Sequence, residues 1–282
     1  MKILITGAYG QLGNEVILAL KQYPDLEMII TDIDTLDICS KEAVELFLEQ
    51  KKPDFIVNCA AYTAVDKAEN DIDLCYKINR DAVENLAKSA AKINSKIIHI
   101  STDYVFDGTA NIPYKEDVKV CPASIYGKSK AAGEKILIKN NPNSIVIRTA
   151  WLYSIFGSNF VKTMLSLGAE KKQISVVFDQ IGTPTNAADL ARAIVKIICT
   201  KSFSAGIYHY SNEGVCSWYD FAKAIFEIKN LPCETLPIES SQYPAPAPRP
   251  HYSVLNKTKI KTAFGIKIPH WRESLRNVLE KI

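Results

Sequence analysis

Short apolar runs alternate with longer amphipathic stretches through the first half of the chain. The apolar runs predict strands at Lys2–Thr6, Met28–Thr31, Phe55–Asn58, Lys96–Ile100 and Ser144–Arg148. Their unbroken apolar character is typical of strands that are covered on both faces. Helical periodicity predicts helices at residues 11–21, 41–51, 71–92 and 124–139. The alternation predicts an α/β fold with a doubly wound parallel sheet.

The second half of the chain is less regular. It contains clustered aromatic residues and a proline-rich stretch at residues 244–250. Its pattern predicts helices near residues 158–170, 187–199, 217–228 and 270–281, and strands near 174–178 and 206–210. We therefore expect a dinucleotide-binding domain at residues 1–149. Residues 150–282 are expected to form mainly a smaller α/β substrate lobe, with segments that cross back to the core.

Composition and charge exclude several classes of protein. The 34 basic and 31 acidic residues leave a net charge of +3, too small for a nucleic-acid-binding surface. No apolar run approaches the roughly 18 residues of a membrane span, and the N-terminal run breaks at Gly7 before a signal-peptide core could form. The seven cysteines have no C-x-x-C spacing, so neither a disulfide framework nor a metal site is predicted. We expect a cytoplasmic protein without a nucleic-acid or membrane partner.

Three of the 12 glycines, Gly7, Gly10 and Gly13, follow the first predicted strand and open the first predicted helix. A dinucleotide pyrophosphate approaches the backbone closely at such a turn and meets the free N–H groups of the helix start. The spacing is G-x-x-G-x-x-G, which by itself also fits a structural turn before a helix. The position after a strand favours a Rossmann-type dinucleotide site.

An acidic residue, Asp32, ends the second predicted strand, nineteen residues after Gly13. A carboxylate at this place can accept hydrogen bonds from both ribose hydroxyls of adenosine, although a solvated acid at a strand end is the alternative. The following loop, residues 33–40, adds Asp34 and Asp37 and contains no Lys or Arg. Because a 2′-phosphate would meet like charge there, we expect NADH to be used at least as well as NADPH.

A candidate proton-transfer pair lies in Tyr126-Gly-Lys-Ser-Lys130. Positions i and i+4 share one helix face, so the phenol of Tyr126 and the ammonium of Lys130 can lie side by side, whereas Lys128 points away. A cation about 4 Å from a phenol is expected to lower its pKa by about three units. The Y-x-x-x-K pattern alone is common, and its meaning depends on what lies beside it.

The segment Ser101-Thr102-Asp103-Tyr104 follows the fourth predicted strand, at the sheet edge where such folds bind their ligands. A hydroxyl there can donate a hydrogen bond to the carbonyl oxygen that Tyr126 protonates. The glycine turn, the hydroxyl and the Tyr126–Lys130 pair together predict a nicotinamide-dependent carbonyl reductase.

These motifs resemble the extended short-chain dehydrogenase/reductase superfamily and, within it, the dTDP-4-dehydrorhamnose reductase family. The resemblance covers essentially the whole chain. Its more specific stretches are T-A-V-D-K-A-E at residues 63–69, S-T-D-Y-V-F at 101–106 and D-Q-x-G-x-P-T at 179–185. It implies reduction of the C4 ketone of dTDP-4-dehydro-L-rhamnose, a dTDP-4-keto-6-deoxy sugar, with NADH or NADPH, and it leaves a homodimer open.

The resemblance also implies roles for individual residues. The catalytic residues would be Thr102, Tyr126 and Lys130, of which Tyr126 and Lys130 would also touch the cofactor. The other cofactor-binding residues would be Gly7, Gly10, Gln11, Leu12, Gly13, Asp32, Asp37, Ile38, Ala61, Tyr62 and Thr63. The substrate-binding residues would be Thr102, Asp103, Trp151, Asn159 and Arg249.

Alternatives remain open at this point. Trp151 also fits a core position, and Asn159 also fits a helix N-cap. For the whole chain, the alternatives are another nucleotide-sugar epimerase or dehydratase of the superfamily, and a non-catalytic regulatory subunit resembling the β subunit of methionine adenosyltransferase. The complete set of Thr102, Tyr126 and Lys130 argues against the regulatory subunit.

Overall fold

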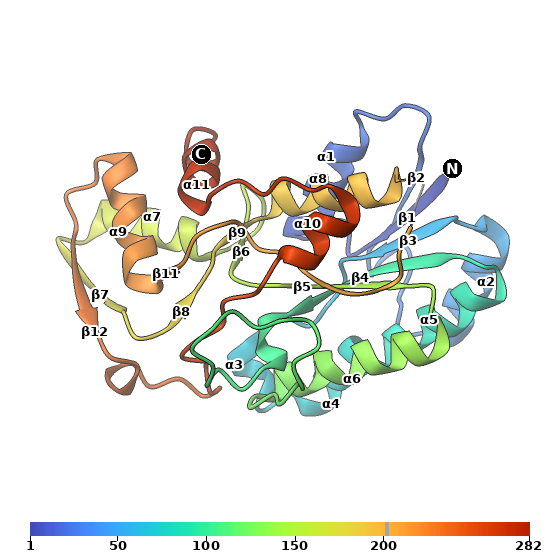
Figure 1. Ribbon diagram of the computed structural model, residues 1–282, viewed down its shortest axis with the longest axis horizontal. Coiled ribbons are helices and arrows are strands. Elements are labelled where there is room, and N and C mark those ends of the chain that lie inside the picture. Colours follow the sequence, from blue (N-terminus) through green and yellow to red (C-terminus); the bar gives the residue numbers. More distant parts are fainter. Residues whose placement is uncertain (201–202) are drawn as a thin grey trace.

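A six-stranded parallel sheet forms the centre of the computed structural model, which describes residues 1–200 and 203–282 (Figure 1). The strand order is β10-β5-β4-β3-β1-β2, and every pairing within it is parallel. The strands are β1 (Lys2–Thr6), β2 (Glu27–Ile30), β3 (Phe55–Asn58), β4 (Lys96–Thr102), β5 (Ile145–Thr149) and β10 (Gly206–His209).

Helices cover both faces of this sheet. One face carries α1 (Gln11–Leu20), α8 (Ala187–Ile198) and α10 (Thr258–Phe264), and the other carries α2 (Lys41–Lys51), α5 (Ala82–Lys92) and α6 (Ile125–Asn140) (Figure 1). Successive residues of β1 point to opposite faces, so Ile3 and Ile5 join the apolar cluster under α1 and α8, whereas Leu4 joins the cluster under α2 and α5. The predicted doubly wound α/β fold is confirmed.

Most predicted elements of the first half lie within two residues of their observed bounds. β1, β3 and α2 begin and end as expected, whereas β4 extends two residues further, to Thr102. The predicted helix at 71–92 is divided into α4 (Ile72–Tyr76), a π-helical turn (Lys77–Asp81) and α5, and the short α3 (Val65–Ala68) precedes it. None of the helices within the described ranges has the length and apolar character to cross a bilayer.

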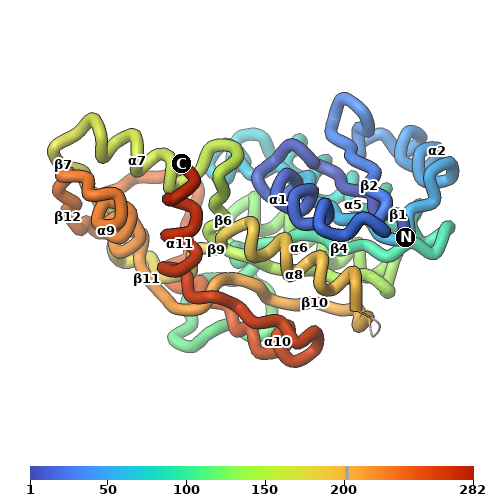
Figure 2. Tube along the Cα trace, turned by 90° about the horizontal axis from the view of Figure 1, so that it is seen from above, coloured from blue at the N-terminus to red at the C-terminus, as the bar shows by residue number. Residues whose placement is uncertain are grey.

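Apart from the apolar core on the two faces of the sheet, which is taken as the first cluster, a second apolar cluster lies beyond the carboxyl ends of the strands and is built from the second half of the chain. It contains α7 (Phe160–Glu170), α9 (Trp218–Lys229) and α11 (Trp271–Leu279), with the paired strands β7 (Gln173–Val177) and β12 (Glu234–Ile238) beside them (Figure 2). Two further pairs are β6 (Leu152–Tyr153) with β9 (Thr185–Asn186) and β8 (Ile181–Gly182) with β11 (Cys216–Ser217). Short 3₁₀ turns span Asp103–Val105 and Ser240–Gln242.

Several segments of the second half belong to the central sheet instead of this cluster, among them α10, which packs on the same face as α1 and α8. β10 pairs with β5 at the sheet edge, and α8 packs beside α1 (Figures 1 and 2). The chain therefore passes between the two apolar clusters several times.

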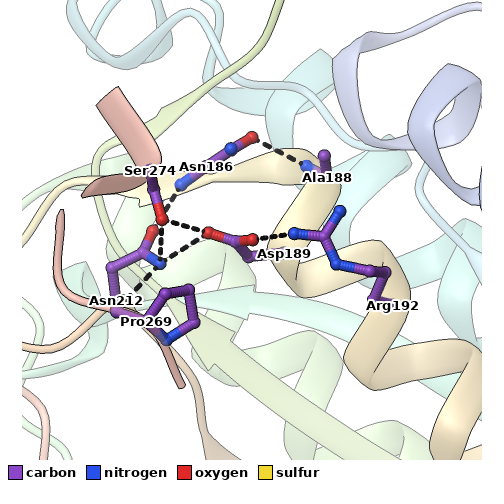
Figure 3. A network of polar contacts seen from close by, with 7 residues as sticks. All are labelled: Asn186, Ala188, Asp189, Arg192, Asn212, Pro269 and Ser274. Atoms are coloured by element: carbon purple, nitrogen blue, oxygen red, sulfur yellow. Dashed lines mark hydrogen bonds and ion pairs between the residues drawn. The ribbon is translucent and has the colours of Figure 1, made fainter. Parts of the chain in front are cut away.

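A buried carboxylate, Asp189 of α8, joins the two clusters (Figure 3). Its Oδ2 accepts a 2.7 Å hydrogen bond from Asn212 Nδ2 and a further one from the hydroxyl of Ser274, which lies on α11. Asn212 also donates to the carbonyl oxygen of Pro269, at 3.2 Å. Because α8 rests on the sheet and α11 belongs to the second cluster, this network fixes one to the other.

Candidate active site

The glycine turn lies where the order of the sheet reverses. The chain leaves β1 for β2 on one side and then returns to β3 on the other, and parallel sheets bind ligands at the carboxyl ends of strands at such a point. Gly7 has φ +62°, and a Cβ there would stand 2.6 Å from the backbone nitrogen of Ala60. A Cβ on Gly13 would stand 2.4 Å from the carbonyl oxygen of Gly7. Only glycine fits these two positions.

A cavity of about 320 Å³ opens beside this turn. Its lining includes six predicted cofactor residues: Gly7, Gly10, Asp32, Asp37, Ile38 and Ala61. The sequence reasoning missed the other six: Ile33, Leu36, Cys39, Cys59, Ala60 and Ile78. Cys59 and Ala60 follow β3 as Asp32 follows β2, so their place at the sheet edge was a usable signal. The predicted residues Gln11, Leu12, Gly13, Tyr62 and Thr63 adjoin the lining residues in sequence but are not part of the lining.

The polar groups at this cavity suit a dinucleotide. The N-cap of α1 is Gly10, which has no side chain to cap the helix, so the first N–H groups of α1 remain available to a phosphate. The carboxylate of Asp32 accepts hydrogen bonds from the backbone of Tyr9 at 2.9 Å and of Ile33 at 2.8 Å, which hold it at the cavity wall. The glycine turn, whose glycines have no Cβ atoms, and the free amides of α1 fit the pyrophosphate of a nicotinamide dinucleotide, and the fixed carboxylate of Asp32 fits its ribose.

The predicted catalytic residues meet at the carboxyl end of β4. Thr102 is the last residue of β4, and Tyr126 lies in the first turn of α6, whose N-cap is Ser124. A Cβ on Gly127 would stand 2.2 Å from the carbonyl oxygen of Tyr104, so glycine lets α6 approach the end of β4 this closely. The hydroxyl of Thr102 lies close enough to the phenol of Tyr126 to lower its pKa.

Lys130 lies one turn further along α6 and is almost completely buried. Its Nζ donates a 2.6 Å hydrogen bond to the carbonyl oxygen of Ile100, on the same strand as Thr102. Burial lowers the pKa of Lys130 to about 8, and the carboxylate of Glu134 opposes this shift. Tyr126 and Lys130 therefore both face the last residues of β4, as their i, i+4 spacing predicts.

The expected direction of the Tyr126 pKa shift is wrong. Burial raises the pKa of the Tyr126 phenol, and the contact with the Thr102 hydroxyl offsets only part of this rise. The cation of Lys130 was the only basis for the expected lowering. In the structure that amine is bonded to Ile100, and the loss of water around the phenol is the larger effect.

Comparison with known proteins places these features in a family. The family described as "RmlD substrate binding domain" matches residues 1–282. The chain belongs to the RmlD family. It is 42% identical over 288 residues to a dTDP-4-dehydrorhamnose reductase of Aggregatibacter actinomycetemcomitans, covering 98% of each chain. The predicted resemblance to dTDP-4-dehydrorhamnose reductases is confirmed.

Two solved structures of the RmlD family resemble this chain closely. The dTDP-4-dehydrorhamnose reductase of Clostridium acetobutylicum is 45% identical with a TM-score of 0.96, over 100% of this chain and 99% of that one. That of Bacillus anthracis, solved in complex with NADP, is 40% identical with a TM-score of 0.96, with the same coverage. The Bacillus anthracis relative thus binds a nicotinamide cofactor in a fold that matches this one.

Among the predicted sugar-binding residues of this RmlD-family chain, Trp151 has an unusual backbone, with φ +46°. Its ring stacks on Trp218 with the centroids 3.7 Å apart. A Cβ on Gly182 would stand 2.7 Å from the same ring. Trp151 therefore packs against other side chains, and because it is partly exposed, part of its surface also remains accessible to a ligand.

The two residues predicted to hold the substrate diphosphate both have partners within the chain. Asn159 is the N-cap of α7, and its amide also donates to Gln11 Oε1 at 2.9 Å, beside the glycine turn. Arg249 forms a bidentate pair with Asp66, at 3.0 and 2.7 Å. The pairing of Arg249 was not foreseen. A role in diphosphate binding stays a prediction. It requires Asn159 and Arg249 either to bind the diphosphate in addition to Gln11 and Asp66 or to break their hydrogen bonds with them.

Asp103 is buried directly beside Thr102, whose hydroxyl donates to Asp103 Oδ1 at 3.0 Å. Its other oxygen, Oδ2, has no well-formed hydrogen bond within the described part of the chain. Burial raises the pKa of Asp103 to about 6, and contacts with Ser253 and Thr102 oppose the rise. A buried carboxylate with a free oxygen is costly for folding, and it suits a residue that binds a sugar hydroxyl.

We predict that Asp103→Asn stabilises the protein at neutral pH. A carboxyl whose pKa is raised on folding gives stability at low pH that is lost as the pH rises through its folded-state value. Removing the charge should therefore raise the free energy of unfolding by about 3 kcal/mol at pH 7.5, and by about half of that at pH 5. Denaturant titrations at the two pH values measure both differences.

Asp107→Asn is the matched control for this prediction. Asp107 is exposed, and hydrogen bonds from Thr109 and Tyr114 lower its pKa, so its replacement should be mildly destabilising at pH 7.5. An Asp103→Asn protein that is less stable than the native chain at pH 7.5 would show that the carboxylate is satisfied in the folded state.

Proposed function

We propose that the protein reduces the C4 ketone of dTDP-4-dehydro-L-rhamnose to the hydroxyl of dTDP-L-rhamnose, with NADH or NADPH as the reductant. The observation that carries this proposal is the meeting of Thr102, Tyr126 and Lys130 at the carboxyl end of β4, in a chain of the RmlD family. The choice of substrate follows from the names of the relatives, and the choice of reaction follows from these residues.

Reduction of the ketone needs a hydride at carbon and a proton at oxygen. The nicotinamide ring, when bound, supplies the hydride. Tyr126 is the proton donor in this proposal. The hydroxyl of Thr102, which donates to Asp103 in this structure, turns to donate a hydrogen bond to the same oxygen as it becomes an alkoxide. Breaking the phenol O–H bond leaves a phenolate on Tyr126. The positive charge of the Lys130 ammonium stabilises this phenolate. The raised pKa of Tyr126 keeps the phenol protonated until the alkoxide forms.

The remaining residues bind and orient in this proposal. The glycine turn with Gln11 and Leu12 holds the pyrophosphate, Asp32, Asp37 and Ile38 hold the adenosine side, and Ala61, Tyr62 and Thr63 line the path from β3. Asp103 and Trp151 contact the sugar, and Asn159 and Arg249 serve the substrate diphosphate. We assign the dinucleotide-binding domain to residues 1–149 and the sugar-binding lobe mainly to residues 150–282, with segments such as β10 and α8 that cross back to the core.

Steady-state oxidation of the reduced cofactor with dTDP-4-dehydro-L-rhamnose tests the proposed function. We expect one cofactor oxidised for each ketone reduced. An epimerase or dehydratase recycles its bound cofactor and would consume none, and a regulatory subunit would show no turnover with any 4-ketosugar.

The cofactor preference is a separate prediction. We expect kcat/KM with NADH to equal or exceed that with NADPH, because Asp32 and Asp37 face the ribose. A neighbouring cavity shares Cys39 with the cofactor cavity and is lined by three cations, Lys41, Lys77 and Arg80. These cations lie outside the acidic loop and could offset the charge of a 2′-phosphate, so NADPH is also expected to bind.

Replacement of Asp32 tests this reading. Asp32→Ala should lower kcat/KM for NADH by about tenfold or more, since it removes a charge-assisted hydrogen bond to the ribose. The value for NADPH should fall less. A ratio of the two values that does not change in Asp32→Ala would contradict the role of this carboxylate.

A further inference from the structure

A row of buried polar side chains, joined by hydrogen bonds, ends at Lys130. The Thr6 hydroxyl donates to Asn58 Oδ1 at 2.8 Å, Asn58 Nδ2 lies 3.0 Å from His99 Nδ1, and His99 Nε2 lies 3.4 Å from Lys130 Nζ. These residues come from β1, β3, β4 and α6, and none is more than 1% exposed. The roles assigned above make no use of Asn58 or His99.

The direction of the hydrogen bonds in this row is fixed by a backbone group. The amide N–H of Ala60, which can only donate, lies 3.2 Å from Asn58 Oδ1. The side-chain nitrogen of Asn58 must therefore face His99, and the Nδ1 of His99 must accept. A neutral imidazole that accepts at Nδ1 carries its proton on Nε2, the nitrogen that faces Lys130. Burial and the charge of Lys130 hold the pKa of His99 well below its usual value, so the ring stays neutral.

We propose, on the basis of the function proposed above, that His99 is a positioning residue: Asn58 locks it as the Nε2–H tautomer, and this N–H favours the neutral amine of Lys130 over the ammonium. A neutral amine has a lone pair that can accept from Nε2–H, whereas an ammonium can only donate. His99 thereby sets the pH at which Lys130 loses the charge that steadies the Tyr126 phenolate. That pH is the alkaline limit of the reaction.

Two other groups around Lys130 act in the opposite direction. Glu134 on the same helix favours the charged form. Cys59 after β3 and Cys75 of α4 also lie near the amine, but burial raises the pKa of both thiols, so they stay neutral. The carbonyl oxygen of Ile100 also favours the charged form, because it accepts from Nζ. Burial and the N–H of His99 oppose them. Burial already lowers the pKa of Lys130 to about 8, and the N–H of His99 acts in the same direction as burial.

The tautomer of His99 can be observed directly in the native protein. Two-bond ¹H–¹⁵N correlation spectra of the full chain labelled with ¹⁵N-histidine report the tautomer of each of its four histidines, and His99→Asn identifies the His99 signals. We expect a neutral Nε2–H ring from pH 6 to pH 9. An Nδ1–H ring or a protonated ring overturns the proposal. The spectra need no turnover, so this result stands apart from the proposed reductase activity.

The pH profile of kcat/KM then tests the effect on Lys130. His99→Asn keeps an acceptor for Asn58 near the Nδ1 position and removes the N–H that faces Lys130. We expect the alkaline limb to move up by about 0.5–1 pH unit, the equivalent of one hydrogen bond. An alkaline limb that stays in place in a folded His99→Asn protein overturns the proposal. If this variant does not fold, the tautomer in the native chain decides.

His270→Asn provides the matched control. His270 is exposed and is the N-cap of α11, where Asn caps equally well, so its pH profile should stay that of the native protein. Active protein with the wrong His99 tautomer overturns only the role of His99, whereas a protein with the expected tautomer and no ketone reduction overturns the proposed function.

Discussion

Tyr126→Phe is expected to lower kcat by about 10²–10⁴-fold while it leaves the binding of NADH nearly unchanged. The change removes the proton donor but keeps the ring, which packs edge-on against Tyr104 with the centroids 5.6 Å apart. The alkoxide would then have to take its proton from water. Rapid-mixing measurements of cofactor oxidation and a fluorescence titration with NADH separate the two effects.

Tyr104→Phe is the control, because it removes the other phenol of this edge-on pair. Tyr104 lies on the 3₁₀ turn after β4, and no role in proton transfer is assigned to its phenol. We expect its kcat to fall by less than about tenfold. Equal losses in the two variants, or near-native turnover in Tyr126→Phe, would reject Tyr126 as the proton donor.

The central sheet could be predicted from the sequence because its strands are buried on both faces. Runs such as Phe55–Asn58 are apolar at every position but the last, and burial of each residue confirms the reason. The two-residue strands were missed because pairing defines them, as with Leu152–Tyr153 and Thr185–Asn186. No local pattern in the sequence marks such a pair.

The break in the predicted helix at 71–92 also depends on distant contacts. The side chain of Asn79 donates to Ser129 Oγ at 3.0 Å and to the Tyr62 carbonyl at 3.1 Å, and it accepts from Tyr62 N. These bonds hold the π-helical turn against α6 and the loop after β3. A helical periodicity read from residues 71–92 alone contains no sign of them.

The candidate site was predictable in part for a similar reason. The positions of Thr102, Tyr126 and Lys130 follow from local rules, a strand end and an i, i+4 helix spacing. The partner of Arg249 is Asp66, 183 residues earlier in the chain, and no spacing rule connects them. The direction of the Tyr126 pKa shift failed because burial is a property of the whole fold.

The ion pair that fixes α6 to the sheet should give the largest stability effect. Glu134 of α6 and Arg148 of β5 are both buried, with N–O distances of 3.0 and 2.7 Å, and Ser101 also donates to Glu134. Glu134→Gln leaves the guanidinium buried without a counter-charge. We expect it to lower the free energy of unfolding by about 3–5 kcal/mol, measured by denaturant titration. The pair Glu84–Lys88, which lies at the surface of α5, provides the control, since Glu84→Gln should cost less than about 1 kcal/mol.

The double variant Glu134→Leu with Arg148→Met decides where this stability comes from. If the loss in Glu134→Gln is the cost of an uncompensated charge, removing both charges should recover most of it, because the desolvation of the ions disappears with them. If the double variant is as unstable as the single one, the hydrogen bonds to Glu134, including that from Ser101, carry the stability. Ser101 precedes Thr102, and Glu134 lies one turn from Lys130. The ion pair would then maintain the catalytic geometry, and the double variant should lose kcat even where it remains folded.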